Sequence, residues 1–436
     1  MTTSQASGSV PRQDDPREPS GASDAVVPTK EGDRIGSLDF IRGIAVMGIL
    51  AANIIAFGQP TNAYIYPEAF LVPNGDPGGW QWIAQFVLID GKMRGLFTVL
   101  FGAGMYLFME RAWARGEGRG LQAWRLLLLA SFGFIHFFFI WMGDILFYYG
   151  VLGMIALLCM RWTAKTQLMV GLVGYALGAL MFAGMLTFPH MIAETSVGEG
   201  EGMADFRAEI SGGIEEALAS DKVPTELKTS GDYAGLVAHR FSEDWATILG
   251  NVGFMLFEMV PLMLIGMALY RLSFFGDGYS RSGLIRWGWV GLAVGGAIHL
   301  LIGLYVQSTG FAFYASTAAI IGWSTLPRIA MVLGLAALMV AYSPGWTGWL
   351  AERVRAAGRA AFTNYLGTSI LMLFVMHGWA LGLFGELNRP QLYLLTAVFW
   401  ILMLVWSKPW LERYRYGPLE WLWRCMTYRK VFPLKR

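Results

Sequence analysis

The chain has 436 residues, of which 55% are hydrophobic and only 15% are Asp, Glu, Lys or Arg. Soluble globular chains carry about a quarter charged residues, so this composition excludes an ordinary soluble domain and indicates a membrane protein. The formal net charge of +2 and the lack of a basic stripe with interleaved aromatic residues make a nucleic-acid partner unexpected. The two cysteines show no metal-ligand spacing, so neither a metal site nor a disulfide is expected.

Residues 1–34 have no apolar core and are rich in Ser, Gly, Pro and Asp, so we predict a disordered cytoplasmic tail rather than a signal peptide. Residues 35–411 are predicted to form an all-α, polytopic membrane bundle, because only helices satisfy their backbone within a single segment in lipid. The predicted spans are about ten: 38–57, 94–110, 122–142, 144–161, 167–187, 246–270, 284–306, 322–342, 361–384 and 391–410.

Basic residues predict the orientation of these spans. They cluster at alternate span ends, including Arg111 to Arg125, Arg271 to Arg286 and the basic tail 412–436, which places both termini in the cytoplasm. The polar segments 58–90 and 188–245 then lie outside, the second as an acidic cap loop. Lys92 and Arg94 are exceptions to this distribution of basic residues, because they lie at the outer end of the second predicted span. Residues 311–342 are too long for one crossing, so we expect a half-helix or re-entrant piece there, with eleven spans as the alternative.

The first span contains ionisable residues, which are costly in a membrane and therefore need a reason. Asp39 and Arg42 are three residues apart, so they lie on one helix face and can pair. Asn53 follows Arg42 by eleven residues, which puts both on one stripe, roughly 16 Å apart along the axis. The stripe predicts a substrate path; the alternative is a helix-start ion pair plus a separate amide contact.

The third and fourth spans form a hairpin with the sequence GFIHFFFIWMGDILFYYG. His136 lies inside a span, and Asp144 follows a tight turn. A histidine is a poised acid or base near neutral pH, and a carboxylate can orient it, so the pair predicts a catalytic site. The alternative is a histidine satisfied by a carbonyl and an aspartate that caps the next helix.

Three further buried residues are candidate substrate-binding groups. Glu258 precedes Pro261, where a kinked helix exposes carbonyl groups, Arg328 follows Pro327 near a span start, and His377 lies near the outer end of its span. A helix-end or snorkelling role is the alternative for Arg328. The chain lacks a phosphate-binding loop, GxSxG, HExxH and CxxC, so nucleotide-driven transport, serine hydrolysis and zinc chemistry are unsupported.

Several segments resemble the YeiB-like family of bacterial inner-membrane proteins, also described as domain of unknown function 418. The segments are LDFIRGIAVMGILAANI, GKMRGLFTVLFGAGM, RLLLLASFGFIHFFFIWMGDILFYYGVLGM, GRAAFTNYLGTSI, LGLFGELNRPQLYLLTAVFW and RYGPLEWLWRCMTYRK. The resemblance covers residues 34–431 apart from the loop 188–245. It implies a multi-pass protein of the bacterial inner membrane.

The first span also resembles those of two membrane acyltransferase groups, the surface-polysaccharide O-acyltransferases and heparan-α-glucosaminide N-acetyltransferase. In the first group an Arg-Gly is followed, eleven residues after the Arg, by a histidine. Here Arg42 and Gly43 match that pattern, but the eleventh residue is Asn53. The second group also has an asparagine there, with its histidine further on, whereas residues 54–90 contain no histidine. A catalytic base must therefore come from elsewhere, His136 first and His377 second.

These observations predict a transmembrane acyltransferase that moves an acyl group from cytoplasmic acyl-CoA to an extracytoplasmic hydroxyl or amine. His136 is expected to be the base, Asp144 its orienter and Asn53 an oxyanion donor. Acyl-CoA, including acetyl-CoA, is a co-substrate and no bound cofactor is expected. Membrane lipids, a glycan or lipid-linked acceptor and a second copy of the chain are the expected partners. The alternative is a transporter for a small polar or lipid-linked solute.

Overall fold

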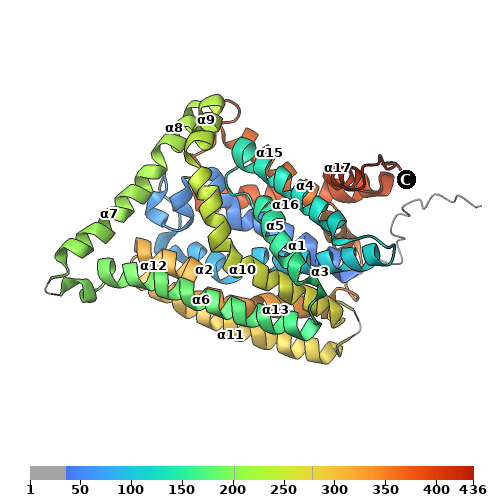
Figure 1. Ribbon diagram of the computed structural model, residues 1–436. Coiled ribbons are helices and arrows are strands. Elements are labelled where there is room, and N and C mark those ends of the chain that lie inside the picture. The colour runs from blue at the N-terminus through green and yellow to red at the C-terminus, as the bar shows by residue number, and fades with distance from the viewer. Residues whose placement is uncertain (1–35, 201, 277) are drawn as a thin grey trace, which may run out of the picture. The chain divides into compact units, whose positions relative to one another are not determined.

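The computed structural model describes residues 36–200, 202–276 and 278–436, and the predicted tail 1–34 lies outside this range. These residues fold into helices, and among them the only strand-like feature is an isolated bridge between Tyr414 and Lys435. The predicted all-α class is therefore confirmed (Figure 1).

A helix coincides with each predicted span. These are α1 (Gly36–Gly58), α3 (Lys92–Trp113), α4 (Arg119–Ile135), α5 (Leu146–Leu158), α6 (Ala164–Glu194), α10 (Trp245–Arg271), α11 (Arg281–Ser308), α13 (Thr325–Tyr342), α15 (Ala361–Met376) and α16 (Arg389–Arg413). The others are α2 (Trp80–Leu88), α7 (Ala204–Ser220), α8 (Lys222–Ser230), α9 (Tyr233–Glu243), α12 (Phe313–Thr317), α14 (Trp349–Arg359) and α17 (Pro418–Tyr428). π-helical turns cover His136–Ile140 and Ala318–Trp323.

Seven of the described helices are long and apolar enough to cross a membrane, namely α1, α4 with its π-turn, α6, α10, α11, α13 and α16. The shorter apolar helices α5 and α15 lie beside them. α15 has 16 residues, about 24 Å of helix, and ends at Met376, so the span predicted over 361–384 is too long. The structure thus describes a multi-pass membrane protein, and the count of ten remains a prediction.

The segment 311–342 differs from the expectation of a half-helix or re-entrant piece. α12, the π-turn Ala318–Trp323 and α13 follow one another with Ser324 also in a helical conformation, so the chain stays helical from Phe313 to Tyr342. The serine and threonine hydroxyls at this junction bond to preceding carbonyl groups, Ser324 to Ile320 at 3.0 Å and Thr325 to Ile321 at 2.6 Å. The extra length is therefore one long helical path beside α6 and α11.

The predicted basic span ends gather at one end of the bundle, which we call the basic end (Figure 1, right). Contacts between the helix ends hold it together. Tyr270 at the end of α10 donates to Glu110 of α3 at 2.7 Å, and Arg281 at the start of α11 donates to the Ala341 carbonyl of α13 at 3.2 Å. This polarity agrees with the distribution that the positive-inside rule requires of a cytoplasmic side.

Glycines allow the central helices to approach closely. On α3 and α10, a Cβ at Gly102 would overlap the Met263 carbonyl, and one at Gly266 would overlap the Val99 carbonyl. The backbones therefore pack against each other directly, as is common between membrane helices, where small residues replace bulky ones at the interface. The contact fixes α3, which lines the cavity described below, relative to α10.

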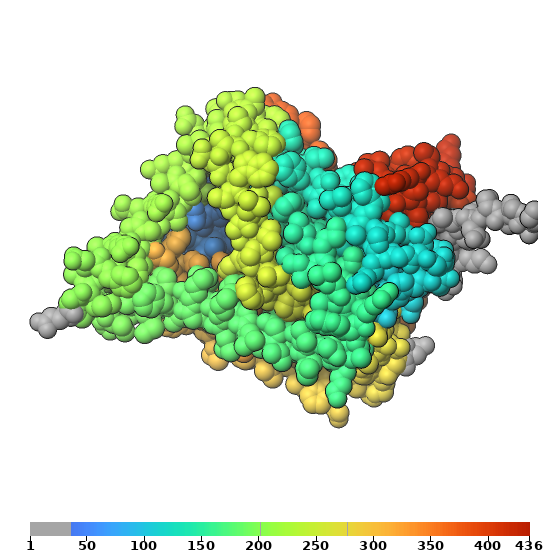
Figure 2. All heavy atoms as spheres, viewed as in Figure 1, coloured from blue at the N-terminus to red at the C-terminus, as the bar shows by residue number. Residues whose placement is uncertain are grey.

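Helices α7, α8 and α9 lie over the opposite end of the bundle and form a cap (Figure 1, left and top). Asp221 between α7 and α8 accepts hydrogen bonds from the backbone N–H of Thr61 at 3.2 Å and of Asn62 at 2.8 Å, which joins the cap to the segment after α1. Figure 2 shows a hollow framed by α6, α7 and α10, so the cap leaves an opening at its side.

Replacing Gly266 with Ala should destabilise the protein, because the added methyl group overlaps the α3 backbone. We expect a loss of about 1–3 kcal/mol, measured as a lower Tm in detergent. Gly184→Ala is the matched control, since nothing lies within 4 Å of a Cβ there, and its Tm should stay level or rise. A Gly266→Ala protein as stable as the parent would contradict the close packing.

Candidate functional site

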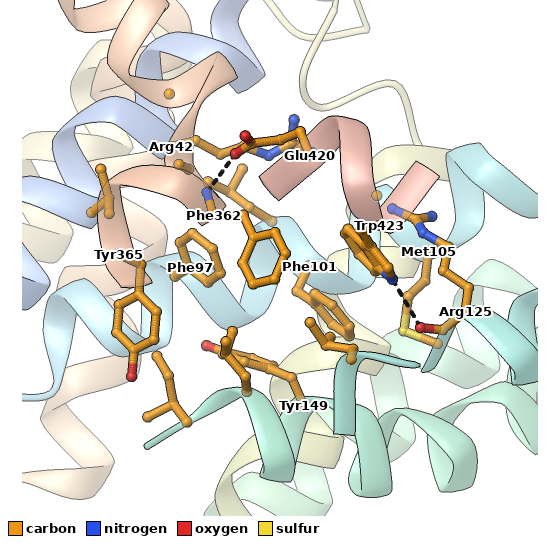
Figure 3. A pocket seen from close by; sticks show the side chains of 18 of the residues that line it. Arg42, Phe97, Phe101, Met105, Arg125, Tyr149, Phe362, Tyr365, Glu420 and Trp423 are labelled. Carbon is orange, nitrogen blue, oxygen red and sulfur yellow. Dashed lines mark hydrogen bonds between the residues drawn. The ribbon is translucent and has the colours of Figure 1, made fainter. Parts of the chain in front are cut away.

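A cavity of about 250 Å³ lies within the bundle, among α1, α3, α4, α5, α15 and α17 (Figure 3). Its walls are mainly apolar and aromatic, with Phe97, Phe101, Phe362 and Trp423 among them. Three arginines, Gln122 and Glu420 also line it. An apolar cavity with cationic groups suits an amphiphile that has an apolar chain and an anionic head.

One stripe of α1 lines this cavity. Arg42, Val46 and Ile49 succeed one another at helical spacing along its wall. Arg42 Nη1 donates to Asp39 at 3.4 Å, which confirms the predicted pair. Asn53 continues the stripe one turn further along α1, is partly buried and does not line the cavity. Arg42 is therefore a cavity residue, whereas Asn53 lies beyond the cavity in the direction of the cap.

At the basic end, α17 closes one side of the cavity. The Arg125 guanidinium lies between the rings of Phe108 and Trp423, 4.4 and 4.3 Å from their centroids, and Trp423 donates to the Arg125 carbonyl at 3.1 Å. Cation–π contacts with these two rings hold the Arg125 guanidinium in place, and they do not neutralise its positive charge. The predicted basic tail 412–436 therefore contains a folded helix that contributes to the site.

Glu420 is the carboxylate among the residues that line the cavity, and the start of α15 occupies it. Its oxygens accept hydrogen bonds from Phe362 N at 2.8 Å, Thr363 N at 3.1 Å and the Thr363 hydroxyl at 2.6 Å. Burial raises the pKa of Glu420, and the hydrogen bonds from Thr363 and the backbone oppose that rise. This carboxylate therefore caps a helix, and Arg42, which pairs with Asp39, lines the cavity together with Arg125 and Arg359.

His136 and Asp144 form the predicted pair. His136 Nδ1 donates to Asp144 Oδ1 at 2.8 Å, and both side chains are fully buried. The second carboxylate oxygen accepts from Phe147 N at 2.7 Å, so Asp144 also caps α5. This fixes the tautomer, because an ionised carboxylate only accepts, and it leaves Nε2 as an acceptor. Nε2 has no hydrogen-bond partner in the described part of the chain.

The His136 ring lies behind Tyr365, one of the residues that line the cavity. Its centroid is 5.3 Å from that of Tyr365, which lines the cavity together with Ile145. On its other side, the cap holds the π-turn: Arg240 donates to the Phe138 carbonyl at 3.2 Å, and Tyr233 donates to the Phe139 carbonyl at 2.6 Å. His136 thus lies between the cavity and the cap, separated from the cavity by one aromatic ring.

Glu258 and Arg328 belong to a separate buried cluster. Glu258 accepts from Arg94 at 2.8 Å and from Arg328 at 3.4 Å, so the carboxylate joins α3, α10 and α13. Arg328 also donates to the Ile320 carbonyl at 2.6 Å, which satisfies the π-turn. The cluster reaches the cavity through Tyr149, whose hydroxyl bonds to Thr98 at 2.8 Å beside Arg94. It neighbours the cavity without lining it.

His377 lies apart from both groups. It follows the end of α15 under the cap, with ring centroids 6.5 Å from Tyr233 and 6.4 Å from Trp379. The adjacent Gly378 N–H donates to the Lys228 carbonyl of α8 at 2.9 Å. The structure therefore brings His136 and Asp144 together, places Arg42 in the cavity, and leaves Glu258, Arg328 and His377 outside it.

Sequence reasoning missed several residues of this site. Arg94 is an exception to the predicted distribution of basic residues. That exception indicates a role for Arg94, because a cation at the outer end of a span needs a buried anionic partner. Arg125 was counted as an orientation marker and Glu420 as part of a tail. Tyr149 and Tyr365 gave no signal, since tyrosines are common in membrane helices.

The fold defines an all-α, multi-pass membrane protein. Residues 269–430 match the family described as "Protein of unknown function (DUF418)". The chain is 29% identical to "Uncharacterized protein YeiB" of Escherichia coli (strain K12), over 92% of this chain and 98% of that protein. It is 28% identical to "Uncharacterized protein YxaH" of Bacillus subtilis (strain 168), over 94% and 98%. These matches confirm the predicted resemblance of the chain to the DUF418 family and to its YeiB-like members. No solved structure matches the chain.

Glu258→Gln should prevent stable folding, because it removes the counter-charge of Arg94 and leaves the buried Arg328 unpaired with any carboxylate of the described cluster. Breaking a buried ion pair from one side costs about 3–5 kcal/mol. The measurement is the yield of monodisperse protein in detergent and its Tm. Glu216→Gln, on an exposed face of the cap, is the control and should behave like the parent. Equal yields of both variants would show that the cluster is dispensable.

Proposed function

We propose that the protein is a transmembrane acyltransferase of the bacterial inner membrane. It moves an acyl group from cytoplasmic acyl-CoA to a hydroxyl or amine of a glycan or lipid-linked acceptor on the other side. The observation that supports this most directly is the His136–Asp144 pair with a free Nε2, located between an arginine-containing apolar cavity and the cap.

The cavity suits the donor. Arg42 and Arg125 at its basic end favour the phosphates of coenzyme A, and the aromatic walls favour an acyl chain. An apolar cavity selects for chain length, because each buried methylene adds about 0.8 kcal/mol. We therefore expect long acyl-CoA to bind more tightly than acetyl-CoA.

The base suits the transfer step. His136 Nε2 takes the proton of the acceptor hydroxyl or amine while the oxygen or nitrogen of the acceptor attacks the thioester carbonyl. The C–S bond then breaks, and the thiolate takes the proton from the imidazolium. Asp144 stabilises the imidazolium during the exchange, and the Asn53 amide donates to the oxyanion. Because Tyr365 lies between His136 and the cavity, its ring must turn aside for the carbonyl to reach Nε2.

The alternative remains a transporter that uses the same buried groups as a solute path. Both hypotheses predict a ligand in the cavity, so binding alone does not separate them. Formation of an acylated product by purified protein does separate them, because a transporter leaves the thioester intact.

His136→Ala should abolish acyl transfer, since it removes the proton acceptor. The rate should fall by at least about 10²-fold, the usual contribution of a general base. The assay follows thiol release from acyl-CoA in the presence of membrane lipid and glycan extracts from the bacterium that produces the protein. His239→Ala on α9 is the matched control and should retain activity. Undiminished transfer by the His136 variant would exclude this residue as the base.

Arg42→Gln and Arg125→Gln should weaken donor binding without unfolding the protein. We expect palmitoyl-CoA at micromolar concentration to raise the Tm of the parent and to raise that of either variant less, because a phosphate contact is lost. Free coenzyme A and acetyl-CoA test the chain-length preference. Arg207→Gln, on α7 of the cap, is the control. An equal shift in all four proteins would place the donor elsewhere.

A further inference from the structure

A group of charged side chains surrounds the turn between α2 and α3. Lys92 is fully buried; its amine donates to the Phe86 carbonyl and lies 5.2 Å from the Phe86 ring centroid. Asp90 is also buried and accepts from Gln85 Nε2 at 3.0 Å. A lysine amine has three donors when protonated, so a single carbonyl leaves it poorly satisfied.

The group continues on both sides of Lys92. Towards the cavity lies the Arg94–Glu258–Arg328 cluster described above. Towards the cap, Arg389 at the start of α16 donates to Gln85 Oε1 at 3.2 Å, and its Nε lies 3.9 Å from Asp76. Arg389 and Asp76 are buried as well. The neutral groups facing the same space are His299 on α11, Tyr64 and Tyr393.

The charges of this group do not balance. Among the residues that the structure describes, its cations are Lys92, Arg94, Arg328 and Arg389, and its carboxylates are Asp76, Asp90 and Glu258. Full ionisation leaves one excess positive charge. The Arg94 side chain is 31% exposed, but Lys92, Arg328 and Arg389 are buried, and an uncompensated buried charge is costly. Nitrogen atoms without a hydrogen-bond partner occur on all three arginines.

Only one of these cations can lose its charge at ordinary pH. Guanidinium groups stay protonated in proteins, whereas an amine releases its proton readily when buried. His299 offers no relief, because its Nδ1 donates to the Gly295 carbonyl at 2.7 Å and the neutral ring already has zero charge. Its ring packs 5.4 Å from Phe86, the residue that Lys92 also contacts.

We infer that Lys92 is a buried proton-binding centre whose amine is uncharged in the resting protein. With Lys92 neutral, the charges of the three carboxylates equal those of the three guanidinium groups. Proton uptake by Lys92 places a new charge between the cavity-side and cap-side clusters. It therefore alters the field on Glu258 and on Asp90 at once. Buried ionisable groups of this kind are the elements of proton-coupled processes in membranes. The inference is independent of acyl transfer.

The test compares Lys92→Met, Lys92→Arg and the parent in detergent between pH 6 and pH 9, with Tm as the readout. Unfolding exposes Lys92, which then binds a proton up to an ordinary pKa of about 10.4, so the unfolded state binds more protons and stability rises with pH. Relative to Lys92→Met, the parent should gain roughly 1–2 °C per pH unit. Lys92→Met should match or exceed the parent at pH 7, and Lys92→Arg, which keeps its charge, should be less stable throughout.

Lys165→Met at an exposed position is the control and should show the pH profile of the parent. The inference is overturned if the Tm of the parent does not rise with pH relative to Lys92→Met, or if Lys92→Met is less stable than Lys92→Arg, since Lys92 is then charged in the folded protein and its charge is useful. It is also overturned if millimolar phosphate or chloride raises the Tm of the parent but not that of Arg389→Met. In that case a bound anion balances the excess charge.

Discussion

The ion pairs of Glu258 with Arg94 and Arg328 are the interaction on which the described bundle depends. A carboxylate buried among α3, α10 and α13 is tolerable only with both guanidinium groups in contact, so it fixes three helices together. The close backbone approach of α3 and α10 at Gly102 and Gly266 makes the short Arg94 contact geometrically accessible. The glycine contact and the ion pairs thus hold the same two helices together.

The cavity lies beside α1, α4 and α15, although α1 and α4 pack closely on other faces: a Cβ at Gly43 would overlap the Val354 carbonyl of α14, and one at Gly133 would overlap the Phe147 backbone of α5. Large rings such as Phe97, Phe101 and Phe362 line this region, and α17 covers its basic end through Trp423. Glu420 ties α17 to the first turn of α15, so the helix that covers the cavity also satisfies backbone N–H groups of one of its walls. The cavity is therefore a consequence of helix positions rather than of one loop.

The sequence predicted what depends on local pattern. Ten helices, the Asp39–Arg42 pair at a spacing of three and the His136–Asp144 pair across a tight turn all follow from residues near one another in the chain. The contact of Arg94 with Glu258 joins residues 164 positions apart, so it depends on which helices become neighbours. The end of α15 at Met376 was missed for a similar reason: the following residues are apolar enough for helix, but the Gly378 N–H bonds to Lys228 of the cap, and Leu383 and Phe384 fold back to bond to carbonyls of α15.

The π-turn after α4 shows how the cap and the candidate base are coupled. A π-turn shifts the hydrogen-bond register, so the carbonyls of Phe138 and Phe139 are left for partners outside the helix. Arg240 and Tyr233 of α9 supply those partners. The His136 ring precedes these two residues and is held by its hydrogen bond to Asp144 and by ring contacts with Tyr365 and Trp141, with Nε2 unengaged among the described residues. The cap therefore holds the backbone turn that positions His136, and His136 in turn packs against Tyr365 in the cavity wall.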